Sequence, residues 1–112
     1  MKFKVTTSKK GTLVVLQGRL DAAVAPEFKR LMGRVLDGED GVIVIDMGAV
    51  EFIDSSGLAT LVECIQGMKK HAGRLSLTGM NENIKDIFVM TRLDTIFEVF
   101  ETEEEALAAA TS

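Results

Sequence analysis

The chain has 112 residues, of which 46% are hydrophobic and 27% charged, and its formal net charge is −4. This length and composition indicate one globular domain, residues 1–112, that is large enough for its own hydrophobic core. The acidic charge and the absence of Trp and Tyr argue against a nucleic-acid-binding surface, which normally carries basic side chains and stacking aromatic rings.

The single cysteine, Cys64, excludes an internal disulfide and fits a reducing compartment. The N-terminus has no apolar signal core, and no apolar run is long enough to cross a bilayer. We therefore expect a cytoplasmic protein with no membrane insertion.

The first elements form a predicted hairpin. Residues 2–6 alternate polar and apolar side chains, which indicates an edge-like strand with one buried face. A turn is expected at 9–11, and residues 12–16 return as a more buried strand that ends at Gly18. Residues 18–21 are expected to lead out of that strand into a loop.

A helix and the central strand follow. Pro26 suits the first position of a helix, where its missing N–H costs nothing. The helix has one apolar stripe, formed by Phe28, Leu31, Met32, Val35 and Leu36. Residues 42–47 open with four consecutive β-branched residues, which favours a strand buried on both faces in the middle of a sheet.

A second helix is expected over 57–72, packed on the sheet through Leu61, Val62 and Ile65. Asp54-Ser55-Ser56-Gly57 precedes it, and Asp and Ser are favoured N-cap residues. These residues alone leave two interpretations open: a simple helix cap, or a serine that is modified or binds an anion at the positive end of the helix.

The last third of the chain again alternates predicted strands and helices. Residues 74–78 form a predicted strand, and Asn81 caps a short helix with Ile84, Ile87 and Phe88 inward. Residues 96–100 form a short extended piece, and Thr102 with Glu105 is a capping-box pattern for a final helix. The order β-β-α-β-α-β-α-(β)-α predicts a mixed α/β fold: a small mixed four- to five-stranded sheet, in which each crossover favours parallel pairing, with about four helices packed against it.

Nothing in this pattern predicts catalysis. Ile53 stands where a nucleophile elbow needs its first glycine, and the one histidine, His71, lies at the far end of the second helix from the serines. One His and one Cys without clustered carboxylates predict no metal site, and phosphate-binding glycine motifs are absent. Cys64 lies inside a helix and is expected to be a buried structural thiol. We expect no enzyme activity and no cofactor.

Several motifs in one register resemble the STAS domain of bacterial anti-sigma-factor antagonists. The most specific is Asp54-Ser55-Ser56-Gly57-Leu58 after a buried strand, and the next is Gly18-Arg19-Leu20-Asp21. The similarity extends to the end of the chain through Gly73, Leu75, Leu77, Gly79, Met90-Thr91-Arg92-Leu93, Phe97, Phe100 and Glu105-Ala106-Leu107. The resemblance implies a STAS-like fold and favours a functional serine over a bare cap.

In that family an unphosphorylated antagonist binds an anti-sigma factor that is also a serine kinase, and this frees the sigma factor. The kinase phosphorylates the serine after the motif's Asp, the complex dissociates, and a serine phosphatase resets the switch. The resemblance thus implies Ser55 as the phosphoacceptor, flanked by Asp54, Ser56 and Gly57. Ser56 lies one residue further into the helix start, and from this position we expect its side chain to cap the backbone. It also implies a neighbouring partner interface formed by Gly18, Arg19, Leu20 and Asp21.

STAS domains also serve as interaction subunits of lipid- or anion-transport complexes and of stress-sensing assemblies, which is the alternative function. A third hypothesis is direct binding of an anion or nucleotide at the helix end that begins at Ser55. We expect a monomer or weak dimer.

Overall fold

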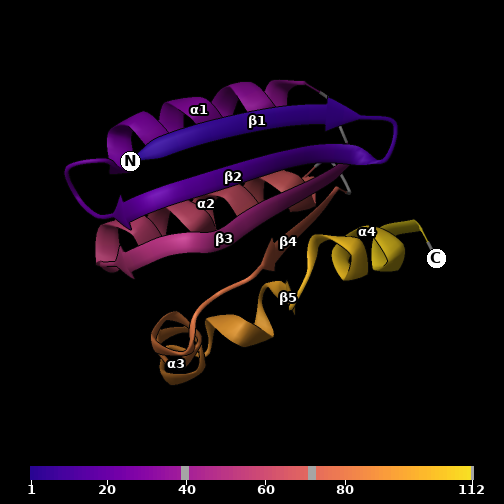
Figure 1. Ribbon diagram of the computed structural model, residues 1–112. Helices are drawn as coiled ribbons and strands as arrows, with labels where there is room; N and C mark the ends of the chain where they lie inside the picture. Colours follow the sequence, from indigo (N-terminus) through magenta and orange to yellow (C-terminus); the bar gives the residue numbers. More distant parts are fainter. Residues whose placement is uncertain (39–40, 71–72, 112) are drawn as a thin grey trace.

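The computed structural model describes residues 1–38, 41–70 and 73–111. One five-stranded sheet runs through the molecule, with helices on both of its faces (Figure 1). The mixed α/β order expected from the sequence is confirmed. The short extended piece is a true strand, preceded by a 3-10 turn, η1, at Leu93–Thr95.

The strands lie in the order in which they occur along the chain. The first two pair antiparallel and all later pairs are parallel, as helical crossovers require. Their bounds are β1 Lys2–Ser8, β2 Gly11–Leu20, β3 Val42–Ile53, β4 Arg74–Thr78 and β5 Glu98–Phe100.

The central strand is β3, and its start is fully buried at Val44 and Ile45, as predicted. The strand continues well beyond residue 47, to Ile53, with irregularities in its pairing to β2. Strand β2 also continues beyond its expected end at Gly18, so that prediction is wrong. Residues 18–20 belong to the strand, because Arg19 pairs with Phe52 and Leu20 with Ile53.

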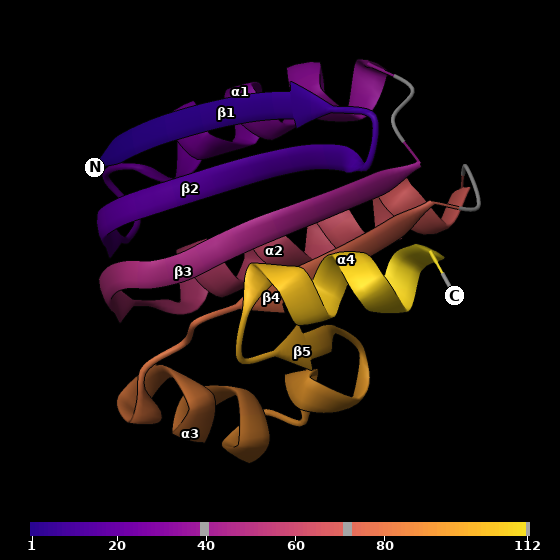
Figure 2. The same cartoon turned by 45° about the vertical axis from the view of Figure 1, so that its right-hand side comes forward.

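Helices α1, Ala25–Asp37, and α2, Ser55–Lys70, cover one face of the sheet (Figures 1 and 2). Pro26 lies in the first turn of α1, where its lack of an N–H is tolerated. In α2, Leu61 and Ile65 are buried as predicted and Val62 is half-buried. The predicted helix end at 71–72, which includes His71, falls outside the described residues.

The remaining helices are capped as the sequence predicts. In α3, Glu82–Met90, the Asn81 side chain accepts a hydrogen bond of 2.9 Å from the Ile84 N–H. In α4, Glu103–Thr111, the Thr102 hydroxyl accepts one of 3.2 Å from the Glu105 N–H. Each cap satisfies a backbone donor that the first helical turn leaves free.

Helix α4 covers the sheet face opposite α2 (Figure 2). Arg74 on β4 joins it to the sheet, because its guanidinium contacts the Glu98 carboxylate and donates a 2.7 Å hydrogen bond to the Ala109 carbonyl. Apolar and polar residues alternate along β4, and its polar residues Ser76 and Thr78 are buried as well. The covering helix is the reason.

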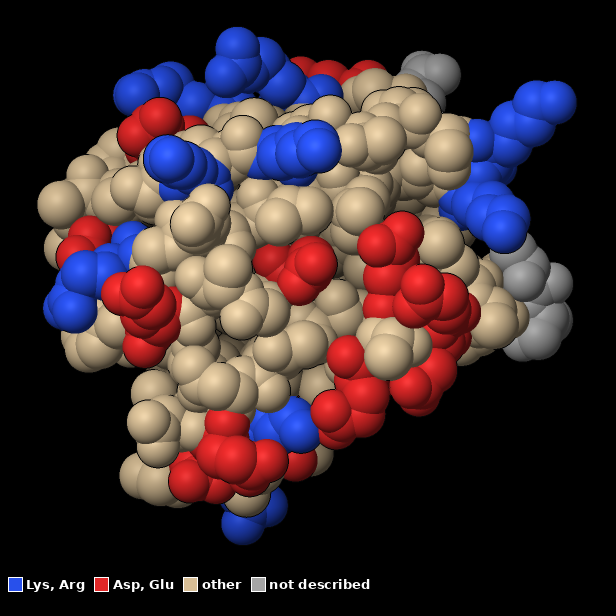
Figure 3. All heavy atoms as spheres, in the orientation of Figure 1, with Lys and Arg blue, Asp and Glu red and all other residues tan. Residues whose placement is uncertain are grey.

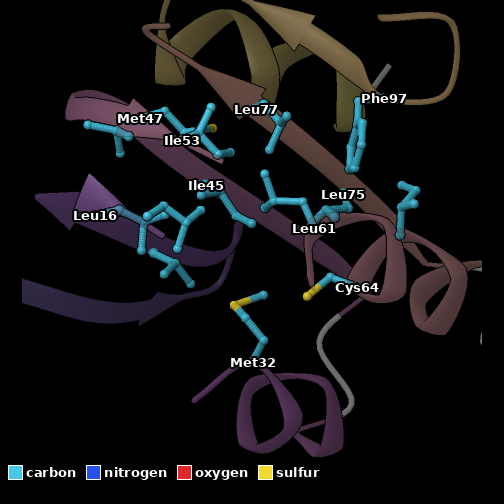
Figure 4. Close-up of a cluster of buried hydrophobic side chains, with 14 of the residues drawn as sticks. Leu16, Met32, Ile45, Met47, Ile53, Leu61, Cys64, Leu75, Leu77 and Phe97 are labelled. Atoms are coloured by element: carbon cyan, nitrogen blue, oxygen red, sulfur yellow. The ribbon is translucent and has the colours of Figure 1, made fainter. Parts of the chain in front are cut away.

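The main core lies between the sheet and the helices α1 and α2. Figure 4 shows its side chains pointing toward one another, from Leu16 and Ile45 on strands to Met32 and Leu61 on helices. Cys64 is part of this cluster, and burial raises the pKa of its thiol to about 12. The prediction of a buried structural thiol is confirmed. No helix in the described ranges is long and apolar enough to cross a membrane.

Candidate functional site

The candidate site lies at one end of the sheet, where β2 and β3 finish side by side and α2 begins (Figure 1). We call this end of the sheet, formed by residues 18–22 and 52–57, the rim. The carboxyl ends of adjacent parallel strands form the usual position of functional loops in such sheets. Asp21 follows β2 directly, and Asp54 and Ser55 follow β3. The two motifs singled out in the sequence are therefore neighbours in space.

Asp54 connects the two strand ends. One carboxylate oxygen, Oδ1, accepts a 3.0 Å hydrogen bond from the Gly57 N–H, and Oδ2 accepts one of 2.9 Å from the Ala22 N–H. The Asp54 N–H in turn donates to the Leu20 carbonyl at 3.3 Å. The bonds from Gly57 and Ala22 lower the pKa of the Asp54 carboxyl from its ordinary value of 3.8, with the bond from Gly57 as the largest cause, so the group is ionised at neutral pH.

Asp54, and not a serine, is the N-cap of α2, because its carboxylate reaches the N–H three residues into the helix. The expectation that the Ser56 side chain caps the backbone is therefore wrong. Ser56 is half-buried, and its carbonyl accepts a 3.0 Å hydrogen bond from the Thr60 hydroxyl.

Ser55 is the first residue of α2 and its side chain is exposed. Within the described part of the chain its hydroxyl has no hydrogen-bond partner. The neighbouring Asp54 carboxylate accepts the hydrogen bond from the first turn of the helix, so the Ser55 hydroxyl is available to solvent and to another molecule.

Gly57 is required by a close approach. A Cβ atom there would collide with the Leu20 carbonyl oxygen, so only glycine lets the first turn of α2 rest on the end of β2. The first turn of α2, which begins with Ser55, therefore lies directly against the end of β2.

Residues 18–21 contribute unequally to the surface at this rim. The Leu20 side chain is 0% exposed and belongs to the core, so only its backbone is near the rim. Arg19 and Asp21 lie at the surface with 3.7 Å between Nε and Oδ2, and Asp21 also accepts a 3.1 Å hydrogen bond from the Ala23 N–H. Gly18 has a φ of +115°, which favours glycine.

Phe52 is a surface residue that the sequence reasoning missed. Its ring is 39% exposed and lies 4.2 Å from the Arg19 guanidinium carbon, in a cation–π arrangement. Exposed aromatic and Arg side chains often carry much of the energy of protein interfaces. The available signal was a large apolar residue two positions before Asp54, beyond the end of the strand expected at 42–47.

The described residues contain no group of three or more His, Cys, Asp or Glu side chains that could hold a metal ion. What the rim offers is a free hydroxyl, an ionised carboxylate and the positive end of a helix. Such a site can accept or hold a phosphoryl group.

Comparison with known proteins gives the same family as the motifs. The STAS domain family matches residues 2–106. The anti-sigma-B factor antagonist of Listeria monocytogenes is 28% identical over 93 residues, which cover 82% of this chain and 81% of the relative. An anti-sigma factor antagonist from Mycobacterium paratuberculosis has a solved structure with a TM-score of 0.91 and 26% identity, covering 99% of this chain and 94% of that one.

A further solved structure is that of the Bacillus cell fate determinant SpoIIAA in the phosphorylated form. It has a TM-score of 0.74 and 21% identity and covers 97% of this chain and 99% of that one, a likeness that shows the fold. The chain belongs to the STAS domain family, as the resemblance of its motifs predicts.

Proposed function

We propose that this protein is an anti-sigma-factor antagonist that works as a phosphorylation-controlled protein–protein switch. In its unphosphorylated form it binds an anti-sigma factor that is also a serine kinase, and the sigma factor is freed. Phosphorylation on Ser55 ends the binding, and a serine phosphatase restores it. The observation that carries the proposal is the exposed Ser55 hydroxyl, without a partner in the described structure, beside a cap made by Asp54.

The charges at the rim explain how phosphorylation would act. A phosphate adds roughly −1.5 to −2 charges at neutral pH. The phosphate would stand next to the ionised Asp54 carboxylate and add to its negative charge. A partner surface that fits the neutral serine would then bind less well, because its negative groups would be repelled and the phosphate would have to lose its water. The N-terminus of α2 would meanwhile stabilise the phosphate, so the fold need not change.

In this role the protein is a substrate and a binding partner, and has no catalytic activity of its own. ATP and its metal ion belong to the kinase. We place the protein in the cytoplasm as a single domain, monomeric or weakly dimeric. The names of its curated relatives support the switch over the alternative of a subunit in a transport or stress-sensing complex.

The test is mass spectrometry after incubation with the cognate kinase and ATP. We expect one phosphate, on Ser55. Ser55→Ala should bind the kinase and accept no phosphate, whereas Ser55→Asp should bind poorly. Phosphate on Ser56, or none on either serine, would contradict the proposal.

Ser55→Ala is also a clean variant for this purpose. Because Asp54 makes the cap, removal of the Ser55 hydroxyl should change the free energy of unfolding by less than about 0.5 kcal/mol. A loss of binding by Ser55→Ala could then not be ascribed to unfolding.

A further inference from the structure

The charges of this protein are strongly segregated along the chain. Residues 1–34 carry eight Lys or Arg side chains and two Asp or Glu, whereas the rest of the chain carries five and fifteen. The strand order places the first segment at one edge of the sheet and the last at the other. Figure 3 shows the result: basic side chains gather at the top, over α1 and β1, and acidic ones lower down, over α4.

The basic edge is formed by β1, which pairs with a neighbour on one side only. An edge strand of seven residues presents backbone N–H and C=O groups that can pair with a further strand. Lys2 and Lys4 are exposed on it, and Arg30 and Arg34 are exposed on the adjacent α1. Within the described ranges, none of these four side chains forms an ion pair.

Beside this strand lies an open groove of about 390 Å³ between β1 and α1. Val5 on the strand and Leu31 and Val35 on the helix give it apolar walls, and Arg34 also lines it. Val5 is 41% exposed, whereas Phe3 on the same side of the strand is stacked on Phe28 of α1. The helix therefore covers one part of this face of β1 and leaves the next part uncovered.

We propose that the β1 edge binds an extended acidic segment of a partner protein, which adds to the sheet as a further strand. Successive side chains of a strand point to opposite faces. Apolar residues of the added strand would enter the groove over Val5 and Leu31, and the acidic residues between them would face Lys2 and Lys4. The expected ligand thus alternates acidic and apolar residues.

Two other occupants fit this edge less well. A second copy that paired through its own β1 would bring its Lys2 and Lys4 close to those of the first, and like charges on paired strands repel. An anionic membrane would match the charge but offers no regular row of donors and acceptors that could pair with the backbone groups of the strand. An acidic strand satisfies both the charges and the backbone.

The probe is a synthetic seven-residue peptide that alternates glutamate and valine, added to ¹⁵N-labelled protein. We expect amide shifts concentrated in residues 2–8, and slower amide exchange there on binding. A peptide of the same composition with its valines in one block should bind much more weakly. Affinity should also fall as salt is added.

Matched charge reversals complete the test. Lys2→Glu combined with Lys4→Glu should weaken binding of the alternating peptide on the order of tenfold or more. Arg92→Glu, an exposed arginine beyond α3, should leave binding unchanged. Equal binding of both peptides, equal binding by the double variant, or binding to phosphatidylglycerol vesicles in place of the peptide would overturn the proposal. So would peptide-independent dimerisation through β1.

Discussion

The Asp54 carboxylate accepts hydrogen bonds from two segments that are far apart in sequence, at Ala22 and Gly57. The same side chain therefore caps α2 and holds the start of the loop after β2. Its neighbour Ser55 is left exposed at the first position of the helix. At the scale of single residues, Asp54 therefore has the structural role, and the proposed phosphoacceptor is a different side chain, Ser55.

The first prediction concerns the acid sensitivity of that cap. Because hydrogen bonds hold the pKa of the folded-state carboxyl below 3.8, its contribution to stability is present above that pH and is lost as the pH falls through the lowered pKa. Asp54→Asn keeps a capping side chain but removes the titrating group. Thermal unfolding at pH 7 and pH 3 should therefore show a smaller acid-induced drop in melting temperature for the variant. Equal drops in the two proteins would contradict this role.

A second prediction separates charge from structure at Asp21. Asp21→Lys should weaken the complex with the kinase because it reverses a charge at the proposed interface, but it also removes the acceptor for the Ala23 N–H. Asp21→Asn retains an acceptor oxygen and removes only the charge. Calorimetric titration of both variants should give the weakest binding for Lys, with Asn between it and the parent. If Asn binds like the parent while Lys unfolds, the Asp21 charge plays no part in the interface.

At the scale of elements, the contact between α2 and the end of β2 decides where the rim lies. Helix α2 begins at Ser55, directly after its cap, and its first turn touches the Leu20 carbonyl through Gly57. Both strands must extend beyond their predicted ends to make this contact. The position of the candidate site is therefore a property of three elements together.

Gly57→Ala tests this contact. Alanine favours a helix by about 1 kcal/mol over glycine, but here its Cβ would collide with the Leu20 carbonyl oxygen, so the variant should be destabilised. Gly33→Ala on α1 is the matched control, since apart from its chain neighbours and the backbone of its own helix turn nothing lies within 4 Å of its added Cβ. It should gain about 0.5–1 kcal/mol. Urea unfolding measures both, and a stabilised Gly57→Ala would show that α2 does not rest on β2.

At the scale of the whole molecule, the sheet is enclosed between two unequal layers. Helices α1 and α2 cover the main core, whereas α4 covers the opposite face near Val44 and Ser76. Arg74 reaches both Glu98 and the Ala109 carbonyl and so ties this helix to β4 and β5. The packing on this face of the sheet therefore depends on α4.

Removal of residues 103–112 is therefore expected to expose Val44 and to leave Arg74 without its contact on α4. Uncovering a fully buried valine costs about 1.5–3 kcal/mol, so the truncated protein should unfold at lower urea concentration. Ala108→Ser, an exposed change on the same helix, should behave like the parent. Unchanged stability after truncation would mean that α4 does not contribute to the core.

Local pattern was sufficient wherever an element is stabilised by its own neighbours in sequence. The strand Arg74–Thr78, the Asn81 cap and the Thr102 cap were all predicted, because alternation and capping depend on residues within one turn or one strand. The sequence also placed the functional hypothesis on Asp54 and Ser55, since the motif itself carries the resemblance.

Only the tertiary structure decided the features that join distant segments. The ends of β2 and β3 pair with each other, and each strand supplies the hydrogen bonds of the other. The residue pattern of either segment alone therefore does not predict where its strand ends. The bond from Ala22 to Asp54 and the contact of Arg19 with Phe52 arise in the same way. Sequence determined which residues are chemically able to act here, and the pairing of the strands determined which of them meet.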